Sequence, residues 1–401
     1  MNIVHLATTD YGGAFKAVQR IQDCIRLYHN QSDILVRTRL FESDTTEVMN
    51  TPIKKFLSKS KNFFNLLVSH GEIVTDLLGT DLSRHSKIRE ADVIMLHWVN
   101  SFISQKSIRQ LARLNKPIIW VMHDMWTFTG GCHYDLYCGR YEKGCGCCPF
   151  LGTHFKKDIS YWNLRRKKKL FDQTAITFVA ISKWEESCAL KSAATRQKNI
   201  VRIPNPINTD IFRSLDREPL RKKYKVSDKK VILFGADKAL ENPMKGFQYL
   251  IEALQYLTGE GYQVVCFGAA PEDKRIAPPD IPVWYLGTIR EEKVLAEWYN
   301  IADVFVSPSL QESFGYTICE ALACGTPAAA FAVGGLLDQI VHKENGYLAK
   351  MCDTRDLAEG IKYCIEHREK LGAAARERVF SHNSYDVVGV QYRKLFECLI
   401  S

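Results

Sequence analysis

Short apolar runs alternate with longer segments of helical periodicity along the whole chain. The runs are continuous rather than interrupted by a polar residue at every second position, which is typical of strands in a sheet that is covered on both faces. The predicted strands are residues 3–6, 34–36, 93–97, 118–122 and 176–180, followed after Pro206 by a second series at residues 231–234, 264–267, 283–286, 304–306 and 328–331. This alternation predicts an α/β protein with two doubly wound, Rossmann-like domains.

The turn Pro204-Asn205-Pro206 separates the two series of strands. We therefore predict an N-terminal domain of residues 1–205, with a cysteine-rich insertion at about residues 126–150, and a C-terminal domain of residues 206–380. Residues 381–401 are predicted to form a helix that packs back on the N-terminal domain. Doubly wound sheets bind ligands outside the carboxyl ends of their strands, so we expect the active site in a cleft across which the two domains face each other.

The composition limits the cellular compartment and the classes of binding partner that we expect. A chain of 401 residues, 46% of them apolar, is long enough for two hydrophobic cores. Thirteen cysteines behind an N-terminus without a basic leader indicate a reducing compartment, so we expect a cytoplasmic protein. No apolar stretch approaches the length of about 18 residues that a membrane-spanning helix needs. The formal net charge of +9 indicates an acidic partner, which could be a nucleotide diphosphate, an anionic lipid or a nucleic acid.

The segment from Pro308 to Pro327 carries the strongest chemical signal. It joins a predicted strand to a predicted helix at residues 317–324, and it places one carboxylate, Glu312, in the loop and another, Glu320, on the helix. Backbone N–H groups at the start of that helix favour a phosphate, because they lack partners within the helix and lie at the positive end of its dipole. These N–H groups belong to Ser313, Phe314 and Gly315. A carboxylate further along the helix can accept hydrogen bonds from sugar or ribose hydroxyls.

Glu312 and Glu320, followed by Ala-Leu-Ala-Cys-Gly-Thr-Pro, resemble the motif of the family-four retaining glycosyltransferases, which have the GT-B fold. The resemblance implies that Glu312 lies beside the transferred sugar and the diphosphate of the donor. It implies that Glu320 binds the ribose of the nucleotide. The alternative is that both are solvated carboxylates on an ordinary surface helix.

Two further loops carry groups suited to a diphosphate. Gly12 and Gly13 lie between the first predicted strand and a helix predicted at residues 14–28, where glycine lets the backbone approach a ligand or simply makes the turn. The resemblance implies that this loop touches the donor phosphate and the acceptor. It also implies that Lys245, in Met-Lys-Gly-Phe, neutralises the leaving diphosphate. Lys238 stands near the place where the family has an arginine, and it would supply a point charge without the guanidinium fork.

His123 follows directly on the predicted strand 118–122, so we expect it at the carboxyl end of that strand, facing the cleft. Seen alone, such a histidine is more often structural, but the resemblance implies a histidine here that contacts the donor. Asp124 is expected to orient His123 or to bind an acceptor hydroxyl. His97, at the end of the preceding strand, is expected to line the acceptor pocket, with ordinary packing as the alternative.

Five cysteines fall within 17 residues, between Cys132 and Cys148. The pair Cys145-x-x-Cys148 has the spacing of a zinc knuckle, and Cys132 and Cys138 could complete a set of four thiolates. Such a zinc ion would be structural, and the alternative is a set of reduced thiols that pack a loop. With His-Asp-Met-Trp and Thr-Gly-Gly-Cys-His-Tyr, this insertion resembles a subgroup of bacterial family-four enzymes that build capsule, exopolysaccharide or lipopolysaccharide.

A basic segment with interleaved aromatic residues runs from Lys156 to Lys169, with Tyr161 and Trp162 inside it. Basic and aromatic side chains together suit an anionic membrane surface that carries a lipid-linked acceptor, and they also suit nucleic acid. The third interpretation is a solvated helix face. The basic residues of the segment are Lys156, Lys157, Arg165, Arg166, Lys167, Lys168 and Lys169.

These features predict a retaining hexosyltransferase that uses a UDP- or GDP-sugar and a glycan or lipid-linked acceptor in bacterial surface-polysaccharide synthesis. His123, Glu312 and Lys245 are the expected catalytic residues, the segments at Gly268 and Ile289 should hold the base and ribose, and no metal cofactor is required. The protein is expected to contact the inner face of the plasma membrane and not to bind nucleic acid. The alternatives are a nucleotide-sugar epimerase or hydrolase on the same fold, and a catalytically weak scaffold that binds sugar nucleotides.

Overall fold

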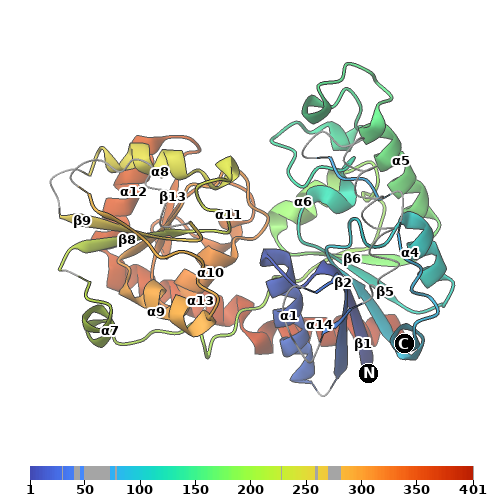
Figure 1. Cartoon of the computed structure of the whole chain (residues 1–401), viewed down its shortest axis with the longest axis horizontal. Coiled ribbons are helices and arrows are strands. Elements are labelled where there is room, and N and C mark those ends of the chain that lie inside the picture. The colour runs from blue at the N-terminus through green and yellow to red at the C-terminus, as the bar shows by residue number, and fades with distance from the viewer. Residues whose placement is uncertain are drawn as a thin grey trace. The chain divides into compact units, whose positions relative to one another are not determined.

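The computed structural model describes residues 1–28, 30–39, 46–48, 73–76, 79–226, 228–257, 261–269 and 281–400. The chain divides into two compact units, Met1–Asn205 with Val388–Ser401, and Pro206–Val387. Each unit is built on one sheet flanked by helices (Figure 1). The C-terminal segment that groups with the first unit begins at Val388 rather than at residue 381.

The first unit contains a parallel sheet in which the described strands follow the order β3-β2-β1-β4-β5-β6-β7. The strands are β1 (Asn2–Thr9), β2 (Gln31–Thr38), β3 (Thr46–Val48), β4 (Val93–Leu96), β5 (Ile118–Met122), β6 (Ile176–Ala180) and β7 (Ile200–Arg202). The helices are α1 (Gly13–Arg26), α3 (Ser86–Glu90), α4 (Gln105–Ala112), α5 (Ile159–Asp172), α6 (Lys183–Lys191) and most of α14 (Tyr385–Ile400), with 3₁₀ turns η1 (Met125–Phe128), η2 (Arg140–Glu142) and η3 (Pro149–Leu151).

The second unit repeats this plan with a parallel sheet in the order β10-β9-β8-β11-β12-β13. Helices lie above and below the sheet in Figure 1. The strands are β8 (Lys230–Gly235), β9 (Tyr262–Phe267), β10 (Val283–Tyr285), β11 (Val304–Ser307), β12 (Ala328–Phe331) and β13 (Gly346–Ala349). The helices are α7 (Arg217–Lys223), α8 (Phe247–Leu254), α9 (Glu292–Ile301), α10 (Tyr316–Ala323), α11 (Leu336–Gln339), α12 (Thr354–Glu366) and α13 (Arg368–Asn383), with the 3₁₀ turn η4 (Pro243–Lys245).

Both sheets have the strand order of doubly wound folds, in which the order reverses beside the first strand, so the predicted fold class is confirmed. All ten predicted strands are present. The sequence analysis missed the edge strands β3, β7 and β13. These strands are only three or four residues long, and most positions of β3 and β7 are partly or fully exposed, so no long apolar run marks them.

Aromatic packing fixes α5 on the first sheet. Trp120 of β5 is 1% exposed and packs against Phe171 of α5 and Phe178 of β6, with ring centroids 5.9 and 6.2 Å away. Such aromatic pairs contribute about 0.5–1.5 kcal/mol each beyond the burial of their area. This packing therefore fixes the C-terminal end of the cysteine-rich insertion, which leads into α5. No helix in the described part of the chain is long and apolar enough to cross a membrane.

Candidate functional site

The loop between β11 and α10 leads into the N-terminus of α10, where backbone N–H groups are available as hydrogen-bond donors. Gly315, the N-cap, has a φ of 83°, which favours glycine. The side-chain amide of Gln339 donates to the carbonyl oxygen of Phe314, which fixes the loop from α11. Ser313 is 3% exposed, and its Oγ has no hydrogen-bond partner among the described residues. The helix begins one residue before the predicted start, at Tyr316.

Glu312 and Lys245 meet in this loop. Lys245 Nζ lies 2.7 Å from Glu312 Oε2, and their side chains are 21% and 15% exposed. A partly exposed pair of this kind contributes about 1 kcal/mol or less to stability. The pair therefore depends on the loops that carry it. The backbone N–H of Gly335 donates to the carbonyl oxygen of Glu312 over 2.8 Å, and this hydrogen bond holds the backbone of Glu312 in place.

The loop that carries Lys245 is locked to the β11–α10 loop by backbone contact. The N–H of Leu310 donates to the carbonyl oxygen of Met244 over 2.9 Å. Gly246, with a φ of 70°, approaches Pro308 so closely that a Cβ would lie 1.9 Å from the Pro308 carbonyl oxygen. Only glycine permits this approach, so the glycine sets the position of the neighbouring lysine.

Glu320 occupies a more enclosed place on α10. It is 2% exposed, and its Oε2 accepts a hydrogen bond of 2.9 Å from the hydroxyl of Tyr299, which is fully buried on α9. The tyrosine fixes one carboxylate oxygen within the unit. The sequence analysis did not identify Tyr299, whose only signal was its helical spacing from the apolar residue Leu295.

The remaining predicted donor residues of this unit follow the ends of β8, β9 and β10. Gly268 has a φ of 77°, and a Cβ there would lie 1.8 Å from the carbonyl oxygen of Ala236, so packing alone requires glycine at this position. Lys238 is exposed in the turn after β8, with a φ of 51°. Ile289 is partly exposed in the loop after β10. Of these three predicted residues, Lys238 therefore offers an exposed cation, while Gly268 and Ile289 offer backbone groups.

In the first unit, Gly12 and Gly13 begin α1. Gly12 is the N-cap and has a φ of 88°, which favours glycine. Gly13 has no such backbone conformation, and a Cβ at either position would meet nothing within 4 Å. Neither turn geometry nor packing requires a glycine at Gly13. The open space beside it leaves room for a ligand to approach the helix N-terminus.

Three histidines form a hydrogen-bonded row across β1, β4 and β5. His5 Nδ1 lies 2.9 Å from His97 Nε2, and His97 Nδ1 lies 2.9 Å from His123 Nε2. The rings are nearly parallel, with interplanar angles of 21° and 23°. His5 and His97 are 0% and 2% exposed, whereas His123 is partly exposed after the end of β5. The sequence analysis missed His5, although it is a polar residue within an apolar strand.

Burial keeps these imidazoles neutral. It lowers the pKa of His5 to about 3 and that of His123 to about 4, and it holds the pKa of His97 well below the ordinary value. The indole N–H of Trp120 donates to the carbonyl oxygen of His97 over 3.2 Å, which fixes the central histidine. The row therefore ends at His123 as an uncharged hydrogen-bonding group.

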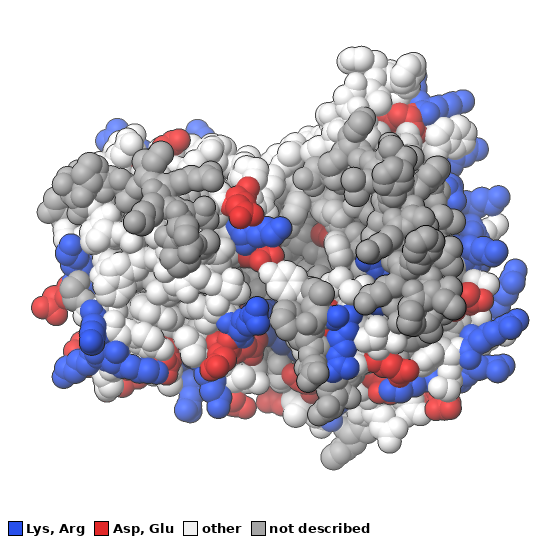
Figure 2. Space-filling view, in the orientation of Figure 1, with Lys and Arg blue, Asp and Glu red and all other residues white. Residues whose placement is uncertain are grey.

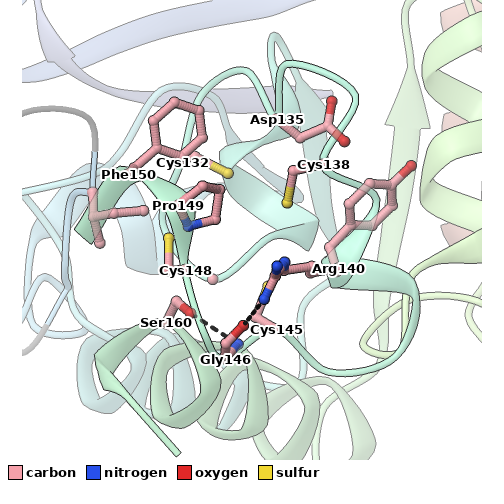
Figure 3. Close-up of a pocket in the computed structure, with 13 residues that line it drawn as sticks. Cys132, Asp135, Cys138, Arg140, Cys145, Gly146, Cys148, Pro149, Phe150 and Ser160 are labelled. Atoms are coloured by element: carbon pink, nitrogen blue, oxygen red, sulfur yellow. Dashed lines mark hydrogen bonds between the residues drawn. The ribbon is translucent and has the colours of Figure 1, made fainter. Parts of the chain in front are cut away.

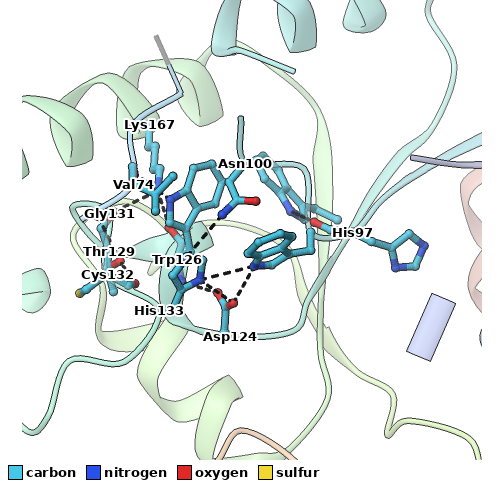
Figure 4. Close-up of polar contacts among 12 residues, drawn as sticks. Val74, His97, Asn100, Asp124, Trp126, Thr129, Gly131, Cys132, His133 and Lys167 are labelled. Atoms are coloured by element: carbon cyan, nitrogen blue, oxygen red, sulfur yellow. Dashed lines mark hydrogen bonds and ion pairs between the residues drawn. The ribbon is translucent and has the colours of Figure 1, made fainter. Parts of the chain in front are cut away.

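Asp124 forms a hydrogen-bond network with His133 (Figure 4). Its Oδ2 lies 2.7 Å from Nδ1 of His133 and accepts a hydrogen bond of 3.1 Å from the indole of Trp98. Its Oδ1 accepts from the N–H of Trp126 over 2.8 Å, which caps η1. Burial alone would raise the pKa of Asp124, but His133 and this N–H hold the pKa below its ordinary value. His123 is instead hydrogen-bonded to His97, over 2.9 Å.

One basic residue of the segment predicted for membrane contact is buried. Lys167 is 2% exposed, lies 3.7 Å from the centre of the Trp126 ring, and donates to the carbonyl oxygens of Trp126 and Thr129. Burial lowers the pKa of Lys167 to about 8. Lys167 is therefore not available for the predicted membrane contact, and its side chain instead packs beneath the insertion.

Four cysteines of the insertion line one small cavity (Figure 3). Cys132, Cys138, Cys145 and Cys148 surround a space of about 20 Å³, which is room for a single water or ion. Without a metal ion, burial raises the pKa of Cys132 and of Cys145 to about 12, which keeps both as neutral thiols. Within the described ranges, no three histidine, cysteine or acidic side chains are arranged to hold a metal ion.

Comparison with known proteins finds a family match within the second unit. Residues 216–378 match the family described as "Glycosyl transferases group 1". This segment is similar to the group 1 glycosyltransferases. It contains Lys245, Glu312 and Glu320, and the prediction of a glycosyltransferase domain is confirmed.

Relatives extend the similarity over more of the chain. The D-inositol 3-phosphate glycosyltransferase of Geodermatophilus obscurus is 32% identical over 191 residues, which are 43% of this chain and 42% of the relative. An uncharacterized glycosyltransferase of Methanocaldococcus jannaschii is 29% identical over 311 residues, 74% of this chain and 72% of the relative. The chain spans about half of the length of the first curated relatives, so the match alone assigns no substrate.

Solved structures share the fold of both units. Sucrose-phosphate synthase from Thermosynechococcus elongatus has a TM-score of 0.70 and 19% identity, over 100% of this chain and 99% of that one. HepE from Anabaena, solved in complex with UDP, has a TM-score of 0.69 and 18% identity, over 100% of both chains. These likenesses confirm the predicted GT-B fold. The surface-polysaccharide subgroup stays a prediction.

The glycine at position 246 offers a test of how the two loops are locked. We expect Gly246→Ala to lower the free energy of unfolding more than Gly261→Ala, which has a nearly equal φ of 71° but nothing within 4 Å of its Cβ. The left-handed backbone costs about 1–2 kcal/mol in both variants. The clash with the Pro308 carbonyl should add about 1–3 kcal/mol in Gly246→Ala alone. Urea unfolding of both variants measures the difference, and equal losses would contradict the close approach.

Proposed function

We propose that the chain is a retaining hexosyltransferase that moves a sugar from a nucleotide diphosphate donor to a hydroxyl of an acceptor. The observation that supports this most directly is the Lys245–Glu312 pair, 2.7 Å apart, beside the N-terminus of α10 in a group 1 glycosyltransferase domain. A cation and a helix N-terminus together attract a diphosphate. The buried Ser313 hydroxyl, without a partner in the described chain, adds a donor at the same loop.

Each residue of this loop then has a role in the transfer. Lys245 and the backbone N–H groups of Ser313 to Gly315 neutralise the leaving diphosphate, whose charge grows as the glycosidic bond breaks. Glu312 lies beside the transferred sugar, and Glu320, held by Tyr299, binds the ribose. The leaving diphosphate accepts the proton of the acceptor on the same face of the sugar, which retains the configuration. No metal ion takes part in this step.

The residues of the other strand ends complete the donor site in this proposal. Gly12 and Gly13 let the start of α1 approach the donor phosphate, and His123 contacts the transferred sugar. Lys238 supplies the second cation, and the backbone at Gly268 and Ile289 holds the base. His97 positions His123 through the hydrogen bond between them. Asp124 is hydrogen-bonded to Trp98 and His133, and in this proposal the three residues line the acceptor side of the site.

A UDP-sugar is the proposed donor, because HepE, a neighbour in fold, was solved with UDP and with UDP-glucose. The proposed acceptor is a glycan or a lipid-linked glycan in bacterial capsule, exopolysaccharide or lipopolysaccharide synthesis. The cysteine-rich insertion with its His-Asp-Met-Trp and Thr-Gly-Gly-Cys-His-Tyr motifs supports this acceptor class. The protein named for D-inositol 3-phosphate among the relatives makes a small phosphorylated acceptor the competing outcome of an acceptor screen.

Contact with an anionic membrane is the second part of the proposal. Phe155 and Trp162 are 75% and 47% exposed, and Lys156, Lys157 and Arg165 beside them are exposed as well. Exposed aromatic and basic side chains together bind the interface of an anionic bilayer. Figure 2 shows lysines and arginines gathered along one edge of the first unit. A lipid-linked acceptor would be reached from such a surface.

A structural zinc ion at the cysteine cavity is the third part. Four thiols from one loop line a space for one ion, and thiolates are the preferred ligands of structural zinc. Their sulfur atoms would have to converge, because no three of the described side chains form a ligand set. The backbone of this loop is strained, because Cys145 and Cys147 have φ values of 61° and 48°, which are unfavourable for residues other than glycine. A bound zinc ion would offset the free energy of this strain.

Donor turnover tests the transferase proposal. We expect the wild type to transfer sugar from a UDP-sugar to an acceptor, and Lys245→Ala and Glu312→Gln each to lower kcat about a hundredfold or more. Glu359→Gln is the control, because Glu359 also pairs with a basic residue, Arg355, but is 65% exposed. Product analysis with and without acceptor separates transfer from epimerisation and hydrolysis. Donor binding without turnover in the folded wild type would favour the scaffold.

Vesicle binding tests the membrane proposal. We expect the protein to co-float with phosphatidylserine vesicles and not with phosphatidylcholine vesicles at low salt, because the contact is electrostatic. The double variant Lys156→Gln and Lys157→Gln should bind several-fold more weakly. The double variant Lys222→Gln and Lys370→Gln removes the same charge from exposed sites of the second unit and should bind as the wild type does. Equal binding by both double variants would refute this surface.

Metal analysis tests the zinc proposal. We expect about one zinc per chain in protein purified under reducing conditions, by mass spectrometry of the metal content. The double variant Cys145→Ser and Cys148→Ser should lose the metal and melt at a lower temperature. The double variant Cys352→Ser and Cys398→Ser, at exposed cysteines, should keep it. A metal-free wild type that melts unchanged with a chelator would show reduced thiols packing a loop.

A further inference from the structure

The histidine row has an inner end and an outer end. His5, at the inner end, is fully buried on β1, and His123, at the outer end, is the partly exposed member. Between them, His97 contacts both neighbours through its two ring nitrogens, each at 2.9 Å. Any preference for a proton position at His5 is therefore passed through His97 to His123.

The number of protons in the row follows from its neutrality. A neutral imidazole carries one N–H and one lone pair, so each contact must join a donor on one ring to an acceptor on the next. Two arrangements satisfy both contacts. In the first, His5 and His97 donate from Nδ1, and His123 accepts at Nε2. In the second, His123 and His97 donate from Nε2, and His5 accepts at Nδ1.

The inner end distinguishes the two arrangements. Nε2 of His5 is buried and has no hydrogen-bond partner among the described residues. In the first arrangement this nitrogen carries only a lone pair. In the second it carries a proton, which would be a buried N–H without an acceptor. Buried N–H groups without partners are rarer in proteins than buried acceptors without partners, so the first arrangement is favoured.

We propose that His5 and His97 fix His123 as the Nδ1–H tautomer, so that His123 offers a hydrogen-bond donor to a ligand oxygen and does not act as a base. His5 and His97 are positioning residues, since they act only through His123. The oxygen that receives this hydrogen bond would be a hydroxyl or phosphate oxygen of the sugar nucleotide, and this identification rests on the proposed function. The tautomer itself does not depend on it.

Nitrogen NMR of the ligand-free protein tests the tautomer directly. Protein labelled with ¹⁵N in its histidine rings should show His123 with a protonated Nδ1 and an unprotonated Nε2, with the signals assigned by their loss in His123→Asn. His5→Asn keeps a donor near the position of Nδ1 and should preserve this tautomer. His5→Leu removes the donor, and both tautomers of His123 should then be populated. A protonated Nε2 at His123 in the wild type would overturn the inference.

Activity provides a second, independent readout. The side-chain amide of asparagine reproduces an Nδ1–H donor, whereas that of glutamine reaches the position of Nε2. We therefore expect His123→Asn to retain activity within about tenfold of the wild type and His123→Gln to lose about a hundredfold. His382→Asn, at an exposed histidine of α13, should have no effect. Equal losses in the two His123 variants would contradict the donor role. Absence of turnover in the wild type, with the expected tautomer, would refute the proposed function alone.

Discussion

The candidate residues of both units depend on one constraint, which is that parallel strands bring their carboxyl ends to the same edge of a sheet. Lys245 and Glu312 are 67 residues apart, yet they meet at 2.7 Å because β8 and β11 are neighbours in the sheet. His97 and His123 meet for the same reason, since β4 and β5 are paired. The close approach of Gly246 to Pro308 then converts this proximity into a fixed geometry.

Much of this arrangement could be predicted from the sequence, because central strands of a covered sheet are continuous apolar runs. The four residues of β4 and the five of β5 are all buried, and the sequence predicted both strands. Strand order could not be predicted in the same way, since nothing local specifies which strands pair. The resemblance could therefore place Glu312 and Lys245 beside the same diphosphate, but the ion pair between them was found only in the structure, where β8 lies beside β11.

Two misread side chains show where residue type conflicts with position. Lys167 lies among basic residues, which favoured an exposed interpretation, but its spacing from Leu164 and Phe171 puts it on the buried face of α5. His5 occupies an apolar strand, where it was overlooked, although a buried polar residue must find a partner. In both cases the position within the helix or strand indicated burial. The structure then identified the partners, which are Trp126 for Lys167 and His97 for His5.

The two units contribute different kinds of interaction. Burial keeps the histidine row neutral, so the first unit offers hydrogen bonds at His123 and the backbone of Gly12 and Gly13, but little positive charge from histidine. In the proposed transfer, the charge of the diphosphate must then be balanced by Lys245 and the N-terminus of α10. Protonation of His123 could not replace a lost Lys245 near neutral pH, because the pKa of His123 is about 4. In the proposed transfer, orientation by His123 and charge neutralisation by Lys245 are thus assigned to residues of different units.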